Sequence, residues 1–178
     1  MTSRRQRYYQ IKPGRKHVKT AIVRLVMLTL GHAFQTAYRI DPEVKKEVDS
    51  WPPTFHVVLE VEPDGPRMTL IKRNGALQYL GEKELYNADV VIVMKSIEFM
   101  FRMTMGMMSM PRIVAENRQY MKGDLVLAGS IIRCMNRVQT MMIPVVTGLY
   151  IKKVPPLSLR MIKNRIIFWT CGVWGLVK

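Results

Sequence analysis

The chain lacks the features that identify several common classes of protein. It has only two cysteines in 178 residues, Cys134 and Cys171, which are too few for a disulfide framework or a structural zinc site. Its longest uncharged apolar run, residues 166–177, has twelve residues, whereas a membrane-spanning helix needs about 20. We therefore expect reduced thiols, a cytoplasmic location and no transmembrane segment.

Acidic residues are missing from both ends of the chain. Residues 1–40 hold nine Lys or Arg and residues 125–178 hold eight, with no acid in either, whereas residues 41–124 hold eleven and all thirteen acids. A nearly neutral body with basic ends differs from a nucleic-acid-binding domain, whose basic patch lies on the fold itself. The basic ends either contact an anionic membrane surface or promote solubility.

Motifs of catalysis are also missing. The three histidines, His17, His32 and His56, lie far apart, and none belongs to an acid–base motif. The sequence contains no nucleophile elbow, no phosphate-binding glycine loop and no paired-carboxylate motif. We therefore expect no enzymatic activity, no catalytic residue, no metal site and no cofactor.

Periodicity and turn signals predict an α/β fold. Alternating and β-branched stretches predict five strands, at residues 54–61, 67–73, 76–80, 89–95 and 118–122. Asn74-Gly75 is a strong signal for a hairpin between the second and third strands. Helical patterns cover residues 16–39, 42–49, 97–108, 110–117, 125–140 and 157–177. The first helix has a predicted polar face made of Arg24, Gly31, His32, Gln35 and Arg39.

The most unusual stretch is residues 99–111, FMFRMTMGMMSMP. Six of the eleven residues from Met100 to Met110 are methionine, and eleven of the chain's fifteen methionines lie between Met94 and Met142. A helix with this sequence has apolar side chains around most of its circumference, so we expect it to be enclosed on two sides. Its narrow polar stripe consists of Glu98, Arg102 and Ser109.

Three interpretations of the Met-rich stretch compete. A soft-metal site built from Met103, Met105 and Met107 is disfavoured, because alternate residues of a helix point about 200° apart. Ordinary core is the simplest interpretation. The flexible, polarizable side chain of methionine nevertheless favours the wall of a cavity for an apolar ligand, or a groove for a partner.

The order of elements resembles that of the sterol carrier protein type-two family of nonspecific lipid-binding domains. The resemblance covers about residues 51–143. It rests on Ala88-Asp89 before a strand, Ser96–Phe99 opening a helix, Met103-Thr104 and Gly106 within it, and Gly123-Asp124 before the next helix. Met105 is an additional residue relative to the family's helix, and the basic N-terminal extension is longer than usual.

The resemblance implies a five-stranded, mainly antiparallel sheet covered by helices, with an apolar tunnel between them. Members of the family bind fatty acyl chains, sterols or other lipids and catalyse no reaction. On this sequence the tunnel wall would consist of Phe99, Met100, Met103, Met107, Met108, Leu125, Leu127, Ile131 and Met135. The domains expected are a basic helical extension (residues 1–50), the lipid-binding body (51–154) and a basic, aromatic C-terminal helix (155–178).

The C-terminal helix combines basic residues with tryptophan, a pattern typical of helices at a bilayer interface. Its expected membrane-contact residues are Arg160, Lys163, Arg165, Trp169 and Trp174. Alternatively, this helix docks over the tunnel mouth or against a partner subunit. The sequence thus predicts either a lipid-binding protein peripheral to the membrane, or an accessory subunit that binds a partner protein or a second copy through its terminal helices.

Overall fold

A long helix near the N-terminus sets the frame of the molecule. The computed structural model describes residues 16–85, 87–105, 107–108, 110–142, 163, 166–167 and 169–170. In it, helix α2 runs from His17 to Ile40. The helix predicted at residues 16–39 is therefore confirmed. Its buried stripe recurs at helical spacing, as the apolar period of the sequence requires, and consists of Val23, Met27, Leu30, Gly31, Ala33, Phe34, Thr36 and Ala37.

One residue of this stripe departs from the sequence prediction. Gly31 belongs to the face expected to be polar, yet it is buried against Tyr79 of β3 (Ala76–Tyr79). A Cβ atom on Gly31 would lie only 2.4–2.7 Å from three atoms of the Tyr79 ring. The prediction for Gly31 is wrong because its missing side chain lets α2 approach the strand more closely than any other residue would.

A short helix, α3 (Pro42–Asp49), follows α2 after a single capping residue. The carboxylate of Asp41 accepts hydrogen bonds from the backbone N–H groups of Glu43 (2.8 Å) and Val44 (3.3 Å). Pro42 occupies the first turn, where its missing N–H needs no partner. The predicted cap and helix are both confirmed.

The five predicted strands form one sheet with the order β3-β2-β1-β4-β5. The remaining strands are β1 (Phe55–Val61), β2 (Arg67–Arg73), β4 (Val90–Met94) and β5 (Gln119–Gly123). Three of the four pairings are antiparallel, and only β1 and β4 run parallel. The expected α/β fold with a mainly antiparallel five-stranded sheet is confirmed.

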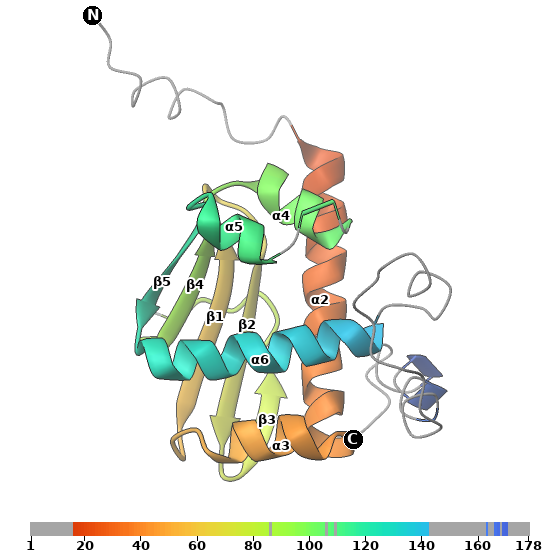
Figure 1. The fold of residues 1–178 in the computed structure, drawn as a ribbon, viewed down its shortest axis with the longest axis vertical. Coiled ribbons are helices and arrows are strands. Elements are labelled where there is room, and N and C mark those ends of the chain that lie inside the picture. The colour runs from red at the N-terminus through yellow and green to blue at the C-terminus, as the bar shows by residue number, and fades with distance from the viewer. Residues whose placement is uncertain are drawn as a thin grey trace, which may run out of the picture.

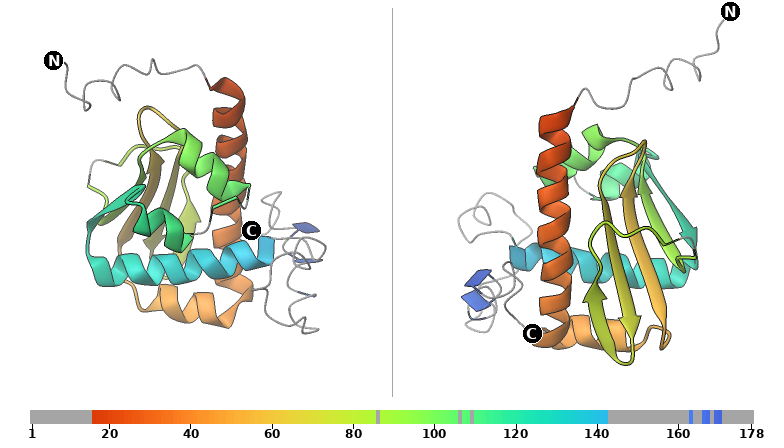
Figure 2. Two further views of the ribbon diagram at one scale, coloured as in Figure 1. Left: turned by 45° about the horizontal axis from the view of Figure 1, so that its top comes forward. Right: turned by 180° about the vertical axis from the view of Figure 1, so that it is seen from behind.

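The helices gather on one face of this sheet (Figure 1). α6 (Leu125–Met142) crosses that face, while α4 (Ile97–Thr104) and α5 (Met110–Ala115) cover one end. The connection from β3 to β4 crosses the opposite face (Figure 2). Thr69 of β2 holds this connection against the sheet. Its hydroxyl donates to the carbonyl of Lys83 (2.6 Å), and its backbone N–H donates to the carbonyl of Gly81 (3.0 Å).

A buried lysine connects the sheet to the end of α3. Lys72 lies on the helix-facing side of β2, and its ammonium group donates to the carbonyls of Val48 (2.8 Å), Asp49 (3.1 Å) and Trp51 (2.6 Å). The carbonyls of Val48 and Asp49, at the C-terminal end of α3, carry partial negative charge, so together with the carbonyl of Trp51 they surround the buried cation with acceptors. The sequence pattern alone did not indicate this contact.

Several predictions lie outside the described residues. These are the basic residues 1–15, the segment 145–154, and all of the C-terminal helix except Lys163, Ile166, Ile167, Trp169 and Thr170. Within the part of the chain that the structure describes, no helix is long and apolar enough to cross a membrane. The three-part division of the chain stays a prediction.

We expect Gly31→Ala to lower the free energy of unfolding by about 1–3 kcal/mol, because the new methyl group would displace the Tyr79 ring. Gly129→Ala is the matched control in α6, where the nearest atom to the new Cβ is a side-chain nitrogen of Arg133 at 3.7 Å. It should raise stability by about 0.5–1 kcal/mol. Urea denaturation measures both, and equal effects would contradict the close approach of α2 to β3.

Candidate functional site

The Met-rich stretch folds as two short helices joined by a bend, and not as one helix to residue 108. α4 begins at Ser96, whose hydroxyl accepts from the N–H of Glu98 (3.1 Å), as predicted. It ends at Thr104, and the N–H of Met107 donates to the carbonyl of Arg102 (2.9 Å). This is a six-to-one hydrogen bond of the kind found at the C-terminal end of many helices, where glycine is common, and the sequence has a glycine in this segment.

The nine residues predicted to line a tunnel fall into three groups by exposure. Four are buried, three are partly buried against the core, and two face solvent. The buried four are Met100, Met108, Ile131 and Met135; the partly buried three are Phe99, Met103 and Leu127; the exposed two are Met107 and Leu125. Met107 is 67% exposed and Leu125 is 71% exposed, so these two lie at the rim of any enclosed space. Ligand contact by all nine stays a prediction.

α4 is less enclosed than the sequence predicts. Met100 is its only fully buried residue, and Met105, just beyond its end, is exposed. The helix packs mainly against α2 and only lightly against β4. The bend after Thr104 explains the difference, since the prediction assumed one continuous helix to residue 108, whereas the later methionines lie off the axis of α4. From Met100 through Met103 to Met107 the methionines therefore change from fully buried to solvent-exposed, and Met108 is buried again.

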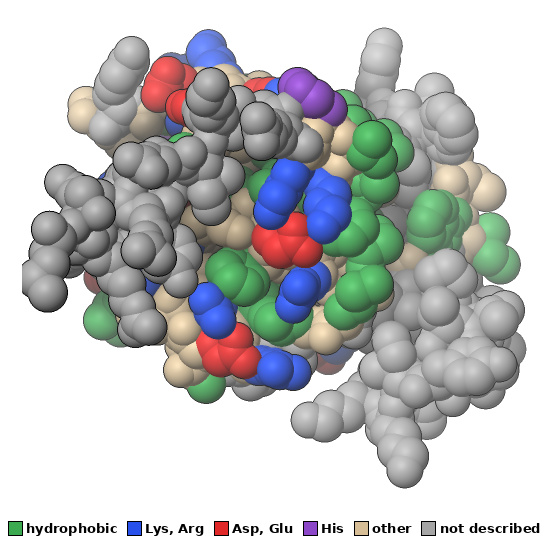
Figure 3. All heavy atoms as spheres, turned by 90° about the horizontal axis from the view of Figure 1, so that it is seen from above, with side chains coloured by type: hydrophobic (Ala, Val, Ile, Leu, Met, Phe, Trp, Pro, Cys, Tyr) green, Lys and Arg blue, Asp and Glu red, His purple; other side chains and the backbone are tan. Residues whose placement is uncertain are grey.

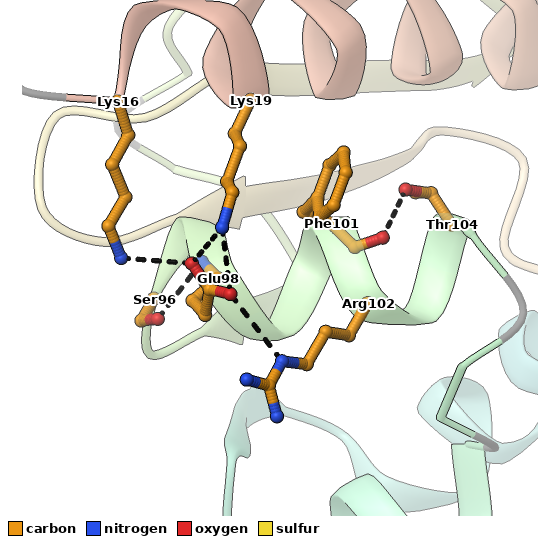
Figure 4. Close-up of polar contacts among 7 residues, drawn as sticks. All are labelled: Lys16, Lys19, Ser96, Glu98, Phe101, Arg102 and Thr104. Atoms are coloured by element: carbon orange, nitrogen blue, oxygen red, sulfur yellow. Dashed lines mark hydrogen bonds and ion pairs between the residues drawn. The ribbon is translucent and has the colours of Figure 1, made fainter.

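Ion pairs hold α4 to the start of α2. The carboxylate of Glu98 accepts from the ammonium groups of Lys19 (2.7 Å) and Lys16 (3.0 Å), and lies 3.5 Å from Nε of Arg102 (Figure 4). Hydrogen bonds from Lys19 and Lys16 lower the pKa of Glu98 to about 2. The pairing of Glu98 with Arg102 was predicted from their spacing of four residues. The ion pairs of Glu98 with Lys16 and Lys19 could not be predicted in this way, because the two lysines lie about 80 residues from Glu98 along the chain.

Both phenylalanines of α4 are covered by a cation. The ammonium of Lys19 lies 5.2 Å from the centre of the Phe101 ring, and the guanidinium of Arg118 lies 4.3 Å from that of Phe99. Cations attract the face of an aromatic ring, so each ring presents one side to the core and the other to a charge. Both rings are partly buried, so they lie at the edge of the core.

The surface above this site mixes basic and apolar side chains. Seen from above, Lys and Arg surround two groups of acidic side chains, and hydrophobic side chains lie around them (Figure 3). On α2 the exposed apolar residues Val18, Leu25 and Leu28 fall on one side, because they are spaced seven and three residues apart. Met105 and Met107 add exposed apolar surface from the bend after α4.

A hollow lies elsewhere, between α3 and α6. It has a volume of about 470 Å³ and is lined by Glu43, Val44, Lys46, Glu47, Ser50, Arg133, Cys134 and Arg137. Its charges pair with one another: Arg133 with Glu47 (2.8 Å), and Arg137 with Glu43 (2.7 Å). This hollow was not predicted from the sequence. The signal that could have indicated it is the spacing of four residues between Glu43 and Glu47 and between Arg133 and Arg137, which places each pair on one edge of a helix.

The residues described offer little for catalysis or metal binding. No group of three His, Cys, Asp or Glu side chains among them could hold a metal ion. Burial raises the pKa of Cys134 to about 12, so its thiol stays protonated at neutral pH and is a poor nucleophile. His32 lies edge-on to Tyr79, with ring centres 5.1 Å apart, and serves the packing of α2.

No protein-family model and no curated protein matches this chain. Among solved structures, it is similar to the ubiquinone synthesis protein UbiJ-SCP2, with 13% identity and a TM-score of 0.42, over 70% of this chain and 99% of that one. It is also similar to sterol carrier protein 2 from Yarrowia lipolytica in its apo form, with 12% identity and a TM-score of 0.41, over 64% of this chain and 89% of that one.

A double mutant of the sec-alkyl sulfatase PisA1 matches 49% of this chain, with 15% identity and a TM-score of 0.38. The chain spans only 14% of that enzyme's length. These likenesses concern the fold alone. The sterol-carrier-like fold recognised from the sequence is shared with solved structures of that family, and what those proteins bind is a property of those proteins.

Replacing the central carboxylate tests whether ion pairs hold α4 in place. The folded-state pKa of Glu98, about 2, lies below the value of about 4.3 in an unfolded chain. Its ion pairs therefore stabilise the fold above about pH 4.3, and this contribution is lost as the pH falls towards 2. We expect Glu98→Gln to lower the free energy of unfolding by about 1 kcal/mol at pH 7 and to have no effect near pH 2.

Glu82→Gln is the matched control, because Glu82 forms one exposed ion pair, with Arg24 (2.6 Å). It should change stability by less than about 0.5 kcal/mol at either pH. Chemical denaturation at a series of pH values measures both variants. A pH-independent effect of Glu98→Gln would show that its ion pairs do not stabilise the fold.

Proposed function

We propose that this chain binds the hydrocarbon part of a lipid, or another apolar molecule, between its sheet and the Met-rich helices. The observation that carries the proposal is the graded burial of the methionines, from Met100 in the core, through Met103, to Met107 in solvent. Such a series of flexible side chains connects the core to the surface without a polar barrier. Methionine suits this role because it adapts to ligands of different shape.

The mobility that uptake requires would come from α4 and α5. α4 rests on α2 through ion pairs with Lys16 and Lys19 and packs only lightly against the sheet. Exposed ion pairs are worth little energy, typically about 0–1 kcal/mol each. The cover over this end of the sheet can therefore separate from it at lower cost than α2, whose buried stripe spans the length of the helix.

The basic surface would bring the protein to anionic lipids. Lys16, Lys19 and Arg102 surround Glu98 near the start of α4, and the exposed Met105 and Met107 follow the end of the same helix, so an anionic headgroup and an apolar chain would bind along one helix. From the C-terminal segment, Lys163 and Trp169 are exposed, whereas Arg160, Arg165 and Trp174 lie outside the described residues. We propose that this segment adds to membrane contact, which would place the protein at the cytoplasmic face of a membrane.

Filling the proposed compartment should block ligand uptake. We expect Met103→Trp to weaken binding of a fluorescent fatty acid by about tenfold or more, because the larger ring occupies the space between α4 and the core. Met105→Trp is the matched control, since Met105 is exposed and its replacement should leave affinity within about twofold. Fluorescence titration after delipidation measures both, and native mass spectrometry of the untreated protein should reveal a copurifying lipid.

The second candidate function is that of an accessory subunit, and the exposed stripe Val18, Leu25 and Leu28 on α2 favours it. An apolar stripe on the outer side of a helix is typical of a surface that packs against a partner helix. In that case the methionines fill the compartment themselves. A protein that contains no lipid and takes up no fluorescent fatty acid would contradict the carrier proposal and favour this one.

Deletion of residues 157–178 tests the membrane role of the C-terminal segment. It removes Trp169, Trp174 and four basic residues, each basic residue near an anionic surface contributing about 1 kcal/mol. We expect cosedimentation with phosphatidylserine-containing vesicles to fall by more than about tenfold. Deletion of residues 1–12 also removes four basic residues but no tryptophan, so it should have a smaller effect. Binding that the first deletion leaves unchanged would remove this role.

A further inference from the structure

A buried glutamine on β5 has no hydrogen-bond partner among the residues that the structure describes. Gln119 is only 6% exposed, and neither its side-chain oxygen nor its side-chain nitrogen contacts a polar atom of the described residues. A buried amide in this state costs about 1–3 kcal/mol. Buried polar groups in folded proteins nearly always have a partner, so an amide with neither group paired indicates that something else is bound there.

Gln119 faces the proposed apolar compartment. It pairs with Met94 of β4, and directly opposed residues in a sheet project to the same side, which here is the core side. β5 begins beside the end of α5, because the N–H of Arg118 donates to the carbonyl of Ile113 (2.9 Å). The guanidinium of Arg118 in turn covers Phe99 of α4. β5 begins at the end of the sheet that α4 and α5 cover (Figure 1), and Gln119 is its first residue.

The surroundings of Gln119 favour an uncharged ligand group. The core-facing residues of β4 are Val90, Ile92 and Met94, and those of β1 are Phe55, Val57, Leu59 and Val61. None of these side chains carries a charge, and a bare carboxylate or ammonium is costly in such a place. The nearest cation in sequence, Arg118, is stacked on Phe99 and pairs with Glu116 (3.2 Å).

The amide also defines the hydrogen-bonding pattern of its partner. Its nitrogen donates and its oxygen accepts, so both are satisfied only by a group that accepts and donates in turn. An alcohol or an amide does both without charge, and a carboxylic acid does so only when it is protonated, whereas an ether or ester can only accept. We propose that Gln119 binds the neutral, hydrogen-bonding end group of a long-chain alcohol or amide whose hydrocarbon part occupies the Met-rich compartment. This inference rests on the proposed function.

The experiment compares three probes of equal chain length: 1-dodecanol, dodecyl methyl ether and dodecane. Each displaces a fluorescent fatty acid from the delipidated full chain. We expect Gln119→Met to lower the ratio of dodecanol affinity to dodecane affinity about tenfold, the value of a lost pair of hydrogen bonds. The ratio for the ether should fall less, and the affinity for dodecane itself should stay within about twofold.

Gln78→Met is the matched control, because Gln78 is an exposed glutamine of β3 in the same sheet. It should leave all three affinities unchanged. If dodecane binds but the ratio is the same in the wild type and in Gln119→Met, this inference is wrong while the proposed function stands. If no probe binds, both are wrong.

Stability without ligand gives an independent measurement. Methionine has nearly the shape of glutamine and no group that needs a hydrogen bond, so Gln119→Met should raise the midpoint of urea denaturation of the empty protein. Gln78→Met should leave the midpoint nearly unchanged. A lowered midpoint for Gln119→Met would show that the amide already has partners in the empty protein, and would overturn the inference.

Discussion

The arrangement of this protein depends on how closely α2 approaches the sheet. Gly31 lets the helix lie against the ring of Tyr79, and the buried stripe from Val23 to Ala37 then packs along β2 and β3. Once α2 is fixed there, its start projects beyond the sheet and offers Lys16 and Lys19 to α4. The other helices occupy the space that α2 leaves. α4 is thus held from the side, by its ion pairs with the start of α2, more than from below, by the sheet.

Local signals in the sequence were sufficient to predict the elements of the fold. The hairpin at Asn74-Gly75, the caps Asp41, Ser96 and Asp124, and the alternation along β1 each depend on residues a few positions apart. Their physical causes are equally local: a turn that needs positive φ, or a side-chain oxygen that pairs with an orphan N–H group. Strand positions were therefore predicted to within a residue or two.

Features that depend on distant residues could not be predicted in this way. The contact of Gly31 with Tyr79, the three carbonyls around Lys72, and the ion pair of Glu47 with Arg133 all join segments 20 or more residues apart. The end of α4 is a different case. Gly106 was a usable local signal for a helix ending, but six methionines around it gave a strong apolar pattern that suggested a longer helix.

The sequence predicted most of the apolar residues of the candidate site but not its buried polar group. The family resemblance placed Met100, Ile131 and Met135 in the tunnel wall, and the structure buries all three. It did not indicate that a polar side chain, Gln119, is buried on the core side of the sheet. The alternation of side chains along β5 gave no indication that Gln119 is buried. Its amide is buried because α5 and α6 pack over the strand.

In the protein without ligand, the methionines and the buried amide of Gln119 differ in their free-energy cost. Flexible thioether side chains can close over a vacated compartment at small cost, because they adapt to many shapes. An amide with neither group paired keeps its cost whatever the methionines do, since they offer no strong donor or acceptor. A ligand that satisfies Gln119 therefore gains from the amide as well as from its hydrocarbon chain. The polar group, although a small part of the surface, then decides which apolar molecules are retained.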